Sequence, residues 1–276
     1  MTRRPDVSIR TSAAIYPTII LLIISAALAW ATHSRNEVWV SPARLWADNT
    51  GKAPQKPRPH YNYATVLAET GSFDMALAEN LRALELYPWY AKAHFNVGAI
   101  YQIKGRTDEA IREYSIAIAL KPDLALAYNN LGFAYYGLGR HEDALEMYAV
   151  ALRLKPSYAK AHANTGRAYL SLGRNSEAEA HLSAALKYDP KEAGTWLLIG
   201  ELHLKEGRTK EAVDELLMAA RLNPEMVEAY NLMGTGYEKL GMYQEAITAY
   251  QSALAIDPAH KNASERLEAL YRGITP

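Results

Sequence analysis

The stretch "AYNNLGFAYYGLGRHEDALEMYAVALRLKP", from Ala127 to Pro156, decides the fold. It holds two segments with helical spacing of apolar residues, joined at Gly139 and closed by Pro156. Glycine supplies the turn between two helices, and proline ends the second helix. The stretch therefore predicts a pair of helices, each about 13 residues long.

The same pattern recurs along the 276-residue chain at a fixed spacing of 34 residues. Seven prolines share this register, and with each proline counted as position 32 of a unit, six full units follow. Position 15 is always glycine, position 8 is glycine or alanine, and positions 20 and 27 are always alanine. Small residues there predict closely packed helices, with position 11, mostly tyrosine, filling the space between them. The units are 57–90, 91–124, 125–158, 159–192, 193–226 and 227–260.

This pattern resembles the tetratricopeptide repeat (TPR) family, and the resemblance covers residues 57–260. It implies an all-α fold, a right-handed TPR superhelix (α-solenoid) with a concave groove lined by the first helix of each unit. A unit of such an array cannot bury its apolar faces alone, so its stability comes from stacking on its neighbours.

Both ends of the array are predicted to be caps. Residues 35–56 keep the register as a half repeat, with a helix from Pro42 to Ala53 that Ser41 can N-cap. Val40 and Leu45 are spaced for a hydrophobic staple at its start. Residues 261–276 predict a C-terminal capping helix with no partner helix after it. Its expected apolar stripe is Ala263, Leu267, Leu270 and Tyr271.

The N-terminus predicts one transmembrane helix. Residues 1–10 are a basic tail, and residues 11–34 contain no Asp, Glu, Lys or Arg. As a helix, the second stretch is about 36 Å long, which exceeds the roughly 30 Å of a bilayer core. The preceding arginines favour a cytoplasmic N-terminus, with the repeats on the non-cytoplasmic side, which is the periplasm in a Gram-negative cell. A signal peptide cleaved near Ala29 is the alternative, and it exports the repeats as well.

Composition and motifs exclude several classes of function. The 30 basic and 30 acidic side chains balance, which argues against a nucleic-acid partner. The chain has no cysteine and therefore no disulfide or thiolate site. It has no phosphate-binding glycine loop, HExxH motif or nucleophile elbow. We therefore predict no catalytic residue, no metal and no cofactor. His60, His94 and His162 share position 4, where packing is favoured over the alternative of a metal-binding row.

Position 6 is the most informative position for binding, because it should face the groove. It is asparagine in four successive units and leucine in the last two. An asparagine amide can both donate to and accept from the backbone of an extended peptide. The row resembles the asparagine ladder in the TPR domain of O-linked N-acetylglucosamine transferase; inheritance by repeat duplication is the alternative. The predicted groove residues are Asn62, Asn96, Asn130, Asn164, Arg58, Lys92, Lys160, Arg167, Leu198 and Leu232.

The favoured function is a membrane-anchored scaffold that binds protein or peptide segments and contacts the lipid bilayer through residues 11–34. An alternative comes from "RNEVWVSPARLW", residues 35–46, which resembles the anchor-to-repeat junction of multi-spanning TPR O-mannosyltransferases and their bacterial relatives. That resemblance implies a substrate-binding remnant or accessory subunit of a glycosyltransferase system, without activity of its own. A secreted assembly factor is a third reading. The carboxylate clamp of cochaperones needs Lys at position 5 and Asn at position 9, which no unit has.

Overall fold

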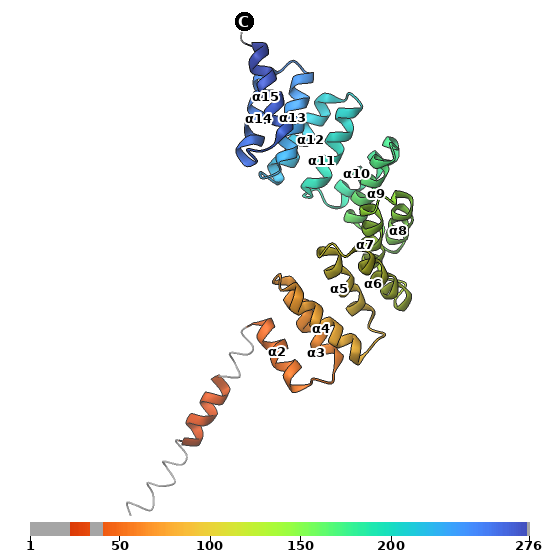
Figure 1. Cartoon of the computed structure of the whole chain (residues 1–276), viewed down its shortest axis with the longest axis vertical. Helices are drawn as coiled ribbons and strands as arrows, with labels where there is room; N and C mark the ends of the chain where they lie inside the picture. Colours follow the sequence, from red (N-terminus) through yellow and green to blue (C-terminus); the bar gives the residue numbers. More distant parts are fainter. Residues whose placement is uncertain (1–22, 34–40, 275–276) are drawn as a thin grey trace, which may run out of the picture. The chain divides into compact units, whose positions relative to one another are not determined.

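The computed structural model describes residues 23–33 and 41–274, and all regular structure in these ranges is helical (Figure 1). Residues 23–33 form one helix, and then come the cap α2, the repeats as α3 to α14 and the cap α15. The chain divides into two compact units, Met1–Ile100 and Tyr101–Pro276. The helices are α2 (Pro42–Lys52), α3 (Pro57–Glu69), α4 (Phe73–Leu86), α5 (Ala91–Ile103), α6 (Thr107–Leu120), α7 (Ala125–Gly137), α8 (His141–Leu154), α9 (Ala159–Ser171), α10 (Asn175–Tyr188), α11 (Ala193–Lys205), α12 (Thr209–Leu222), α13 (Val227–Lys239), α14 (Tyr243–Ile256) and α15 (Lys261–Ile274).

Each repeat contributes one A helix and one B helix of constant length. The A helices, such as α7, have 13 residues, and the B helices, such as α8, have 14. In the first compact unit α3 packs on α4; in the second, α7 packs on α8, α9 on α10, α11 on α12 and α13 on α14. Each of the B helices α6, α8, α10 and α12 also packs on the A helix that follows it. The 34-residue register predicted from the sequence is thus a register of stacked helix pairs.

The turn from helix A to helix B depends on the glycine at position 15. Gly139 has a φ of 74°, and the other five glycines at this position also have a positive φ. The N–H of Gly139 donates to the carbonyl of Tyr136, and the N–H of Arg140 donates to that of Tyr135. These two bonds use carbonyls that the end of α7 leaves unpaired, in a backbone conformation that only glycine adopts without strain.

The two helices of a repeat touch where position 8 faces position 24. A Cβ atom added to Gly132 would lie 2.7 Å from Cε1 of Tyr148, and one added to Gly234 would lie 2.5 Å from Cε1 of Tyr250. Gly166 and Gly200 meet leucines in the same way. The small residue at position 8 is therefore required by the large residue at position 24. The alanines at positions 20 and 27 are almost wholly buried in every repeat: Ala76, Ala110, Ala144, Ala178, Ala212, Ala246, Ala83, Ala117, Ala151, Ala185, Ala219 and Ala253.

The tyrosines at position 11 pack less deeply than the sequence suggested. The ring that fills the interior of the third repeat is Tyr148 at position 24, which is 1% exposed. Tyr135 at position 11 is half-buried against it, and the guanidinium of Arg140 covers its outer face at 4.3 Å from the ring centroid. The guanidinium of Arg106 lies over the Tyr101 ring, and that of Arg174 lies over the Tyr169 ring, in the same arrangement. Position 11 thus forms the boundary of the core, where a cation–π contact closes it.

Helix α2 forms the N-terminal cap. Pro42 is its first residue, and the Ser41 hydroxyl accepts a hydrogen bond from the backbone N–H of Arg44 at 3.2 Å. The helix packs on α3 and ends at Lys52, one residue before the predicted end. The expected staple to Val40 lies outside the described residues.

Helix α15 forms the C-terminal cap and packs on α14. Ala263 and Leu270 are buried in this contact, and Leu267 packs against the same cluster. Tyr271 was expected in the apolar stripe but is 45% exposed, and its hydroxyl accepts a hydrogen bond from Gln251. It lies at the edge of the contact because a phenol keeps its polar end in water.

Within residues 23–33 and 41–274, no helix is both long and apolar enough to cross a membrane. The predicted span, residues 11–34, falls for the most part outside the described residues, and so does the basic tail, residues 1–10.

The contact at position 8 gives a test of the packing. Gly132→Ala should lower the stability by about 1–3 kcal/mol, because the new methyl group meets the Tyr148 ring and the carbonyl of Ala144. Gly137→Ala on the same helix is the matched control. Nothing lies within 4 Å of its added Cβ, so the control should keep or slightly raise stability. Urea unfolding followed by circular dichroism measures both, and equal midpoints for the two variants would contradict the packing argument.

Candidate functional site

The turn from helix B to the next helix A is held by the side chain at position 4. Nε2 of His94 donates to the carbonyl of Pro88 at 2.8 Å, and Nε1 of Trp196 donates to that of Pro190 at 2.9 Å. His60 and His162 make the same contact with the prolines six residues before them. Sequence reasoning assigned this position to packing and missed the bond. The signal that could have revealed this bond is that the histidines and the tryptophan at position 4 all carry a ring N–H.

The histidines do not gather into a metal site. Among the described residues, no group of three or more histidine, aspartate and glutamate side chains could hold a metal ion. Nδ1 of His60 instead contacts Glu79 at 2.6 Å, and Nδ1 of His162 lies 3.2 Å from Nδ1 of His181. Both contacts join position 4 to position 23 of the same repeat. Burial lowers the pKa of His181, and the neighbouring His162 lowers it further.

Four of the predicted groove residues belong to the first compact unit. Asn62 and Asn96 are half-buried, and the Nδ2 of Asn96 donates to the Thr65 hydroxyl at 3.4 Å. This bond joins position 6 of one repeat to position 9 of the repeat before it. Arg58 and Lys92 are exposed at the starts of α3 and α5.

In the second compact unit, asparagine amides form a relay along the A helices. Nδ2 of Asn164 donates to Oδ1 of the buried Asn129 at 3.0 Å, and Nδ2 of Asn129 donates to Oδ1 of Asn130 at 3.2 Å. Nδ2 of Asn130 then donates to the Tyr114 hydroxyl at 3.4 Å, and that hydroxyl donates to Gln102 at 2.7 Å. The predicted residues Asn130 and Asn164 thus hold neighbouring repeats together. Only part of each amide is left for a ligand.

A cavity of about 350 Å³ brings four of the predicted residues together. Lys160, Asn164 and Arg167 line it from α9, and Leu198 lines it from α11. Phe133 on α7, which is 41% exposed, supplies an aromatic wall that the prediction did not include. Asn130 on α7 and Leu232 on α13 do not line this cavity. The site therefore spans the third, fourth and fifth repeats.

The three α9 residues lie on one face, since their spacing of four and three residues matches the helical period. Lys160 is in the first turn, and Arg167 lies about 10 Å further along the helix. The Asn164 Oδ1 atom accepts no hydrogen bond from any described residue, so this acceptor remains for a ligand.

Some charged side chains of the cavity already have hydrogen-bond partners, and others do not. Oδ1 of Asp189 accepts from the N–H of Lys191, and Oε1 of Glu192 accepts from the N–H of Gly194 at the start of α11. These acids serve the turn, at the end of the cavity where Lys160 also lies. Arg167 is half-buried, and its guanidinium makes no ion pair or hydrogen bond with any described residue. It is therefore the cavity cation best placed to receive an anion from a ligand.

The family described as Cilia and flagella-associated protein 70 C-terminal domain, a TPR domain, matches residues 25–272. The chain belongs to this family. Its repeats are therefore tetratricopeptide repeats, and the resemblance read from their spacing is confirmed. The resemblance to glycosyltransferases finds no such support. No curated protein is similar enough to count as a match.

Solved structures show the same TPR fold. The APC/C hetero-tetramer Cut9-Hcn1 aligns with a TM-score of 0.75 and 21% identity, over 82% of this chain and 45% of that one. Pseudomonas aeruginosa pilF aligns with a TM-score of 0.70 and 19% identity, over 79% of this chain and 99% of that one. PilW, a type IV pilus biogenesis factor, aligns with a TM-score of 0.68 and 22% identity, over 78% and 98%. Identities this low show the fold alone.

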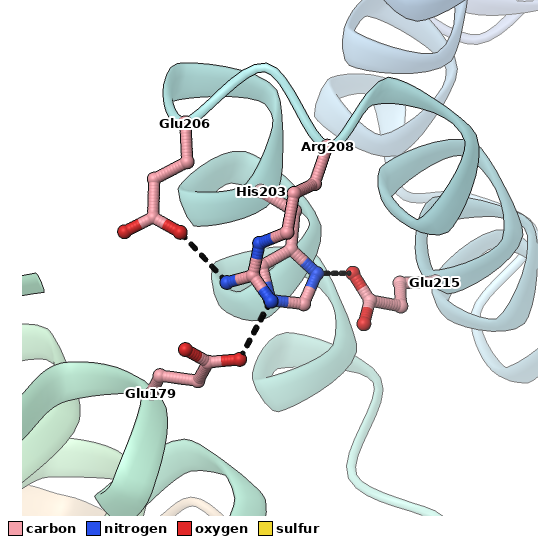
Figure 2. A network of polar contacts seen from close by, with 5 residues as sticks. All are labelled: Glu179, His203, Glu206, Arg208 and Glu215. Atoms are coloured by element: carbon pink, nitrogen blue, oxygen red, sulfur yellow. Dashed lines mark hydrogen bonds and ion pairs between the residues drawn. The ribbon is translucent and has the colours of Figure 1, made fainter. Parts of the chain in front are cut away.

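Position 11 is tyrosine in four of the six TPR units, Leu67 in the first and His203 in the fifth. Figure 2 shows the His203 ring between two carboxylates, with Nδ1 at 2.7 Å from Glu215 and Nε2 at 3.2 Å from Glu179. Arg208 donates to Glu179 at 2.8 Å and to Glu206 at 2.7 Å. Because Glu179 is on α10 of the fourth unit, the network ties two TPR units together.

The replacement of tyrosine redirects the arginine at position 16. Arg140 in the third unit stacks on its own Tyr135 and pairs with Asp143 three residues later. Arg208, with no ring to stack on, reaches the preceding unit instead. Sequence reasoning noted that His203 departs from the repeat, but it could not find partners that lie 24 and 12 residues away.

The network shifts the pKa values of its carboxyls in opposite directions. The hydrogen bond from Arg208 is the main cause that lowers the pKa of Glu179 below its ordinary 4.5. Burial raises the pKa of Glu215 above 4.5, against the opposing effect of His203. Glu179 therefore adds stability that is present above pH 4.5 and is lost as the pH falls through its lowered pKa.

Arg208→Met should remove this contribution. At pH 7 the variant should lose about 0.5–1 kcal/mol, a small value because Glu179 is more than a third exposed. The difference from the wild type should shrink as the pH falls from 4.5 through the lowered pKa of Glu179, because the wild-type carboxylate then loses its charge as well. Lys205→Met, which removes an exposed pair with Glu201, is the control and should cost less than about 0.5 kcal/mol. Thermal unfolding between pH 3 and pH 7 measures this, and a difference as large at pH 3 as at pH 7 would exclude Glu179 as the cause.

Proposed function

We propose that this chain is a TPR scaffold that binds extended protein segments in the cavity lined by α7, α9 and α11. One observation carries the proposal: the cavity holds a half-buried, unpaired Arg167 beside apolar and amide groups from three successive TPR units. A site built from three repeats is long enough for several residues of an extended chain, which rises about 3.3 Å per residue.

The side chains in the cavity indicate which segment it prefers. The fork of Arg167 matches a carboxylate, which it can bind through two parallel hydrogen bonds. Phe133 and Leu198 offer apolar surface for a neighbouring side chain. Oδ1 of Asn164 can accept a backbone N–H without reading a side chain. The preferred ligand is a segment with an acidic residue beside an apolar one.

The expected affinity is modest. A neutral hydrogen bond adds about 0.5–1.5 kcal/mol, and one to a charged group adds about 1.5–3 kcal/mol. Ordering a flexible segment opposes this gain. A dissociation constant of about a micromolar or weaker is the result. A scaffold with such affinity releases its partners readily.

The scaffold is further proposed to be a single-pass membrane protein anchored by residues 11–34, with its repeats on the non-cytoplasmic side. The support is the sequence: a 24-residue stretch without charged side chains, preceded by arginines. A topology reporter fused after residue 40 should be active outside the cytoplasm, and activity inside would contradict this orientation.

An accessory role in a glycosyltransferase system is the second candidate. It rests on the junction sequence of residues 35–46 and on the absence of enzyme motifs in the chain itself. In that role the cavity would present a protein segment to a separate enzyme. The two candidates share the binding site and differ only in what acts on the bound segment.

Selection from a displayed library of random decapeptides tests the ligand class. Binders of the full chain should be enriched in Asp or Glu next to an apolar residue. Arg167→Gln should weaken their binding by about three- to ten-fold, because the neutral amide cannot replace the charged fork. Arg153→Gln on α8 is the matched control, since it removes an exposed cation that does not line the cavity.

Three outcomes would count against the proposal. Enrichment of basic or purely apolar binders would contradict the ligand class. Equal losses for Arg167→Gln and Arg153→Gln would place the binding outside the cavity. If no peptide is enriched at all, the segment-binding function itself is wrong.

A further inference from the structure

Aromatic side chains gather at the turn between α4 and α5, within the first compact unit. Trp89 is 68% exposed and Tyr87 is 47% exposed. The Tyr90 ring lies 6.0 Å from the Tyr87 ring and 4.8 Å from the Tyr61 ring, centroid to centroid. These four side chains, together with the cations Arg58 and Lys92, are called the aromatic patch.

The repeat symmetry shows that the fold does not require Trp89. It stands at position 33, where the later turns hold polar or small residues. The backbone bond across the turn also forms without an indole: Ala91 N–H donates to the Trp89 carbonyl at 3.1 Å, and Ala125 N–H donates to the Asp123 carbonyl at 3.2 Å. Because the same turn forms with aspartate at this position, the exposed indole of Trp89 has no role in the turn and is available to contact a partner. The equivalent residues are Asp123, Ser157, Lys191, Glu225 and Ala259.

Cations flank the aromatic rings. Arg58 and Lys92 are both exposed, at the starts of α3 and α5. Arg58 precedes Tyr61 by three residues on α3, which puts the two on one face of that helix, and Lys92 follows Tyr90 by two residues. The exposed carboxylate of Glu85 on α4 is paired with Arg82 at 2.8 Å. The aromatic patch therefore presents rings and positive charge together.

We propose that the aromatic patch docks on the headgroup region of a phospholipid bilayer. Tryptophan and tyrosine are enriched at that depth because their rings are amphipathic, and each nearby cation adds attraction to anionic lipids. The inference rests on the proposed membrane anchor. If residues 11–34 span the bilayer, the chain from residue 34 to Ser41 can extend at most about 25 Å, so the first compact unit stays within reach of the surface.

A label at residue 89 tests the docking, and the cysteine-free chain allows single labels. Trp89→Cys carries an environment-sensitive fluorophore in the full chain, reconstituted into vesicles of phosphatidylcholine with one part in four phosphatidylglycerol. Glu69→Cys at the end of α3 is the matched control, because it is exposed in the same compact unit but lies one helix length, about 20 Å, from the α4–α5 turn. Lipids with a nitroxide near the headgroup should quench the label at 89 at least about two-fold and leave the label at 69 nearly unchanged.

A second measurement keeps the native indole. A label on Tyr87→Cys, with Trp89 intact, should be quenched as well, and adding Trp89→Ser should reduce that quenching. Unfolding of the labelled chains is checked by circular dichroism.

The outcomes separate the docking from the anchor. If the protein floats with the vesicles but neither label is quenched, the docking is wrong and the anchor stands. If the label at 89 is shielded from water yet unquenched, a protein surface or a second copy covers the patch, and the bilayer is excluded. If the protein does not float with the vesicles, both the anchor and the docking are wrong.

Discussion

In the third to sixth repeats, the two helices approach so closely that position 8 has no room for a side chain. At Gly132, Gly166, Gly200 and Gly234, a β-carbon would meet the position-24 side chain at under 3 Å. In the second repeat, the residue at position 24 also takes part in the amide relay. The Tyr114 ring is fully buried at position 24, while its hydroxyl donates to Gln102 and accepts from Asn130. Burial raises the pKa of Tyr114 to about 12, so the hydroxyl keeps its proton at neutral pH. A buried residue at position 24 thus begins the amide relay.

Because the repeats share this packing, the residues that depart from the pattern stand out. Phe133 and Arg167 at position 9 shape the cavity on α7 and α9. His203 at position 11 exchanges a stacked arginine for ion pairs between repeats. Trp89 at position 33 adds an exposed indole to a turn that elsewhere needs none. None of these residues is needed for the helix pair to form. Each can therefore contact a partner or form bonds between two repeats.

The sequence predicted what depends on local backbone chemistry and strict spacing. Gly139 and Pro42 act within one turn, and the alanines at position 20 allow close packing of neighbouring helices, so their roles follow from the register. It did not predict the bond from Asn164 to Asn129, because that contact depends on how two A helices stack. The same holds for the carboxylates around His203. Asn164 and Arg167 were expected in the groove and line one cavity, but the rows were expected to be continuous, and in the second compact unit Asn130 faces the relay instead.

We propose that partners bind in the cavity and not on the outer B helices of this TPR array. Site-specific photo-crosslinking in cells tests it most directly. A photoreactive amino acid at Phe133, which lines the cavity, is compared with one at Ile116 on the B helix α6, where the side chain is exposed to a similar extent. The account predicts discrete protein adducts from residue 133 that Arg167→Gln weakens, and few from residue 116. Equal adducts from both positions, or adducts from residue 116 alone, would contradict it.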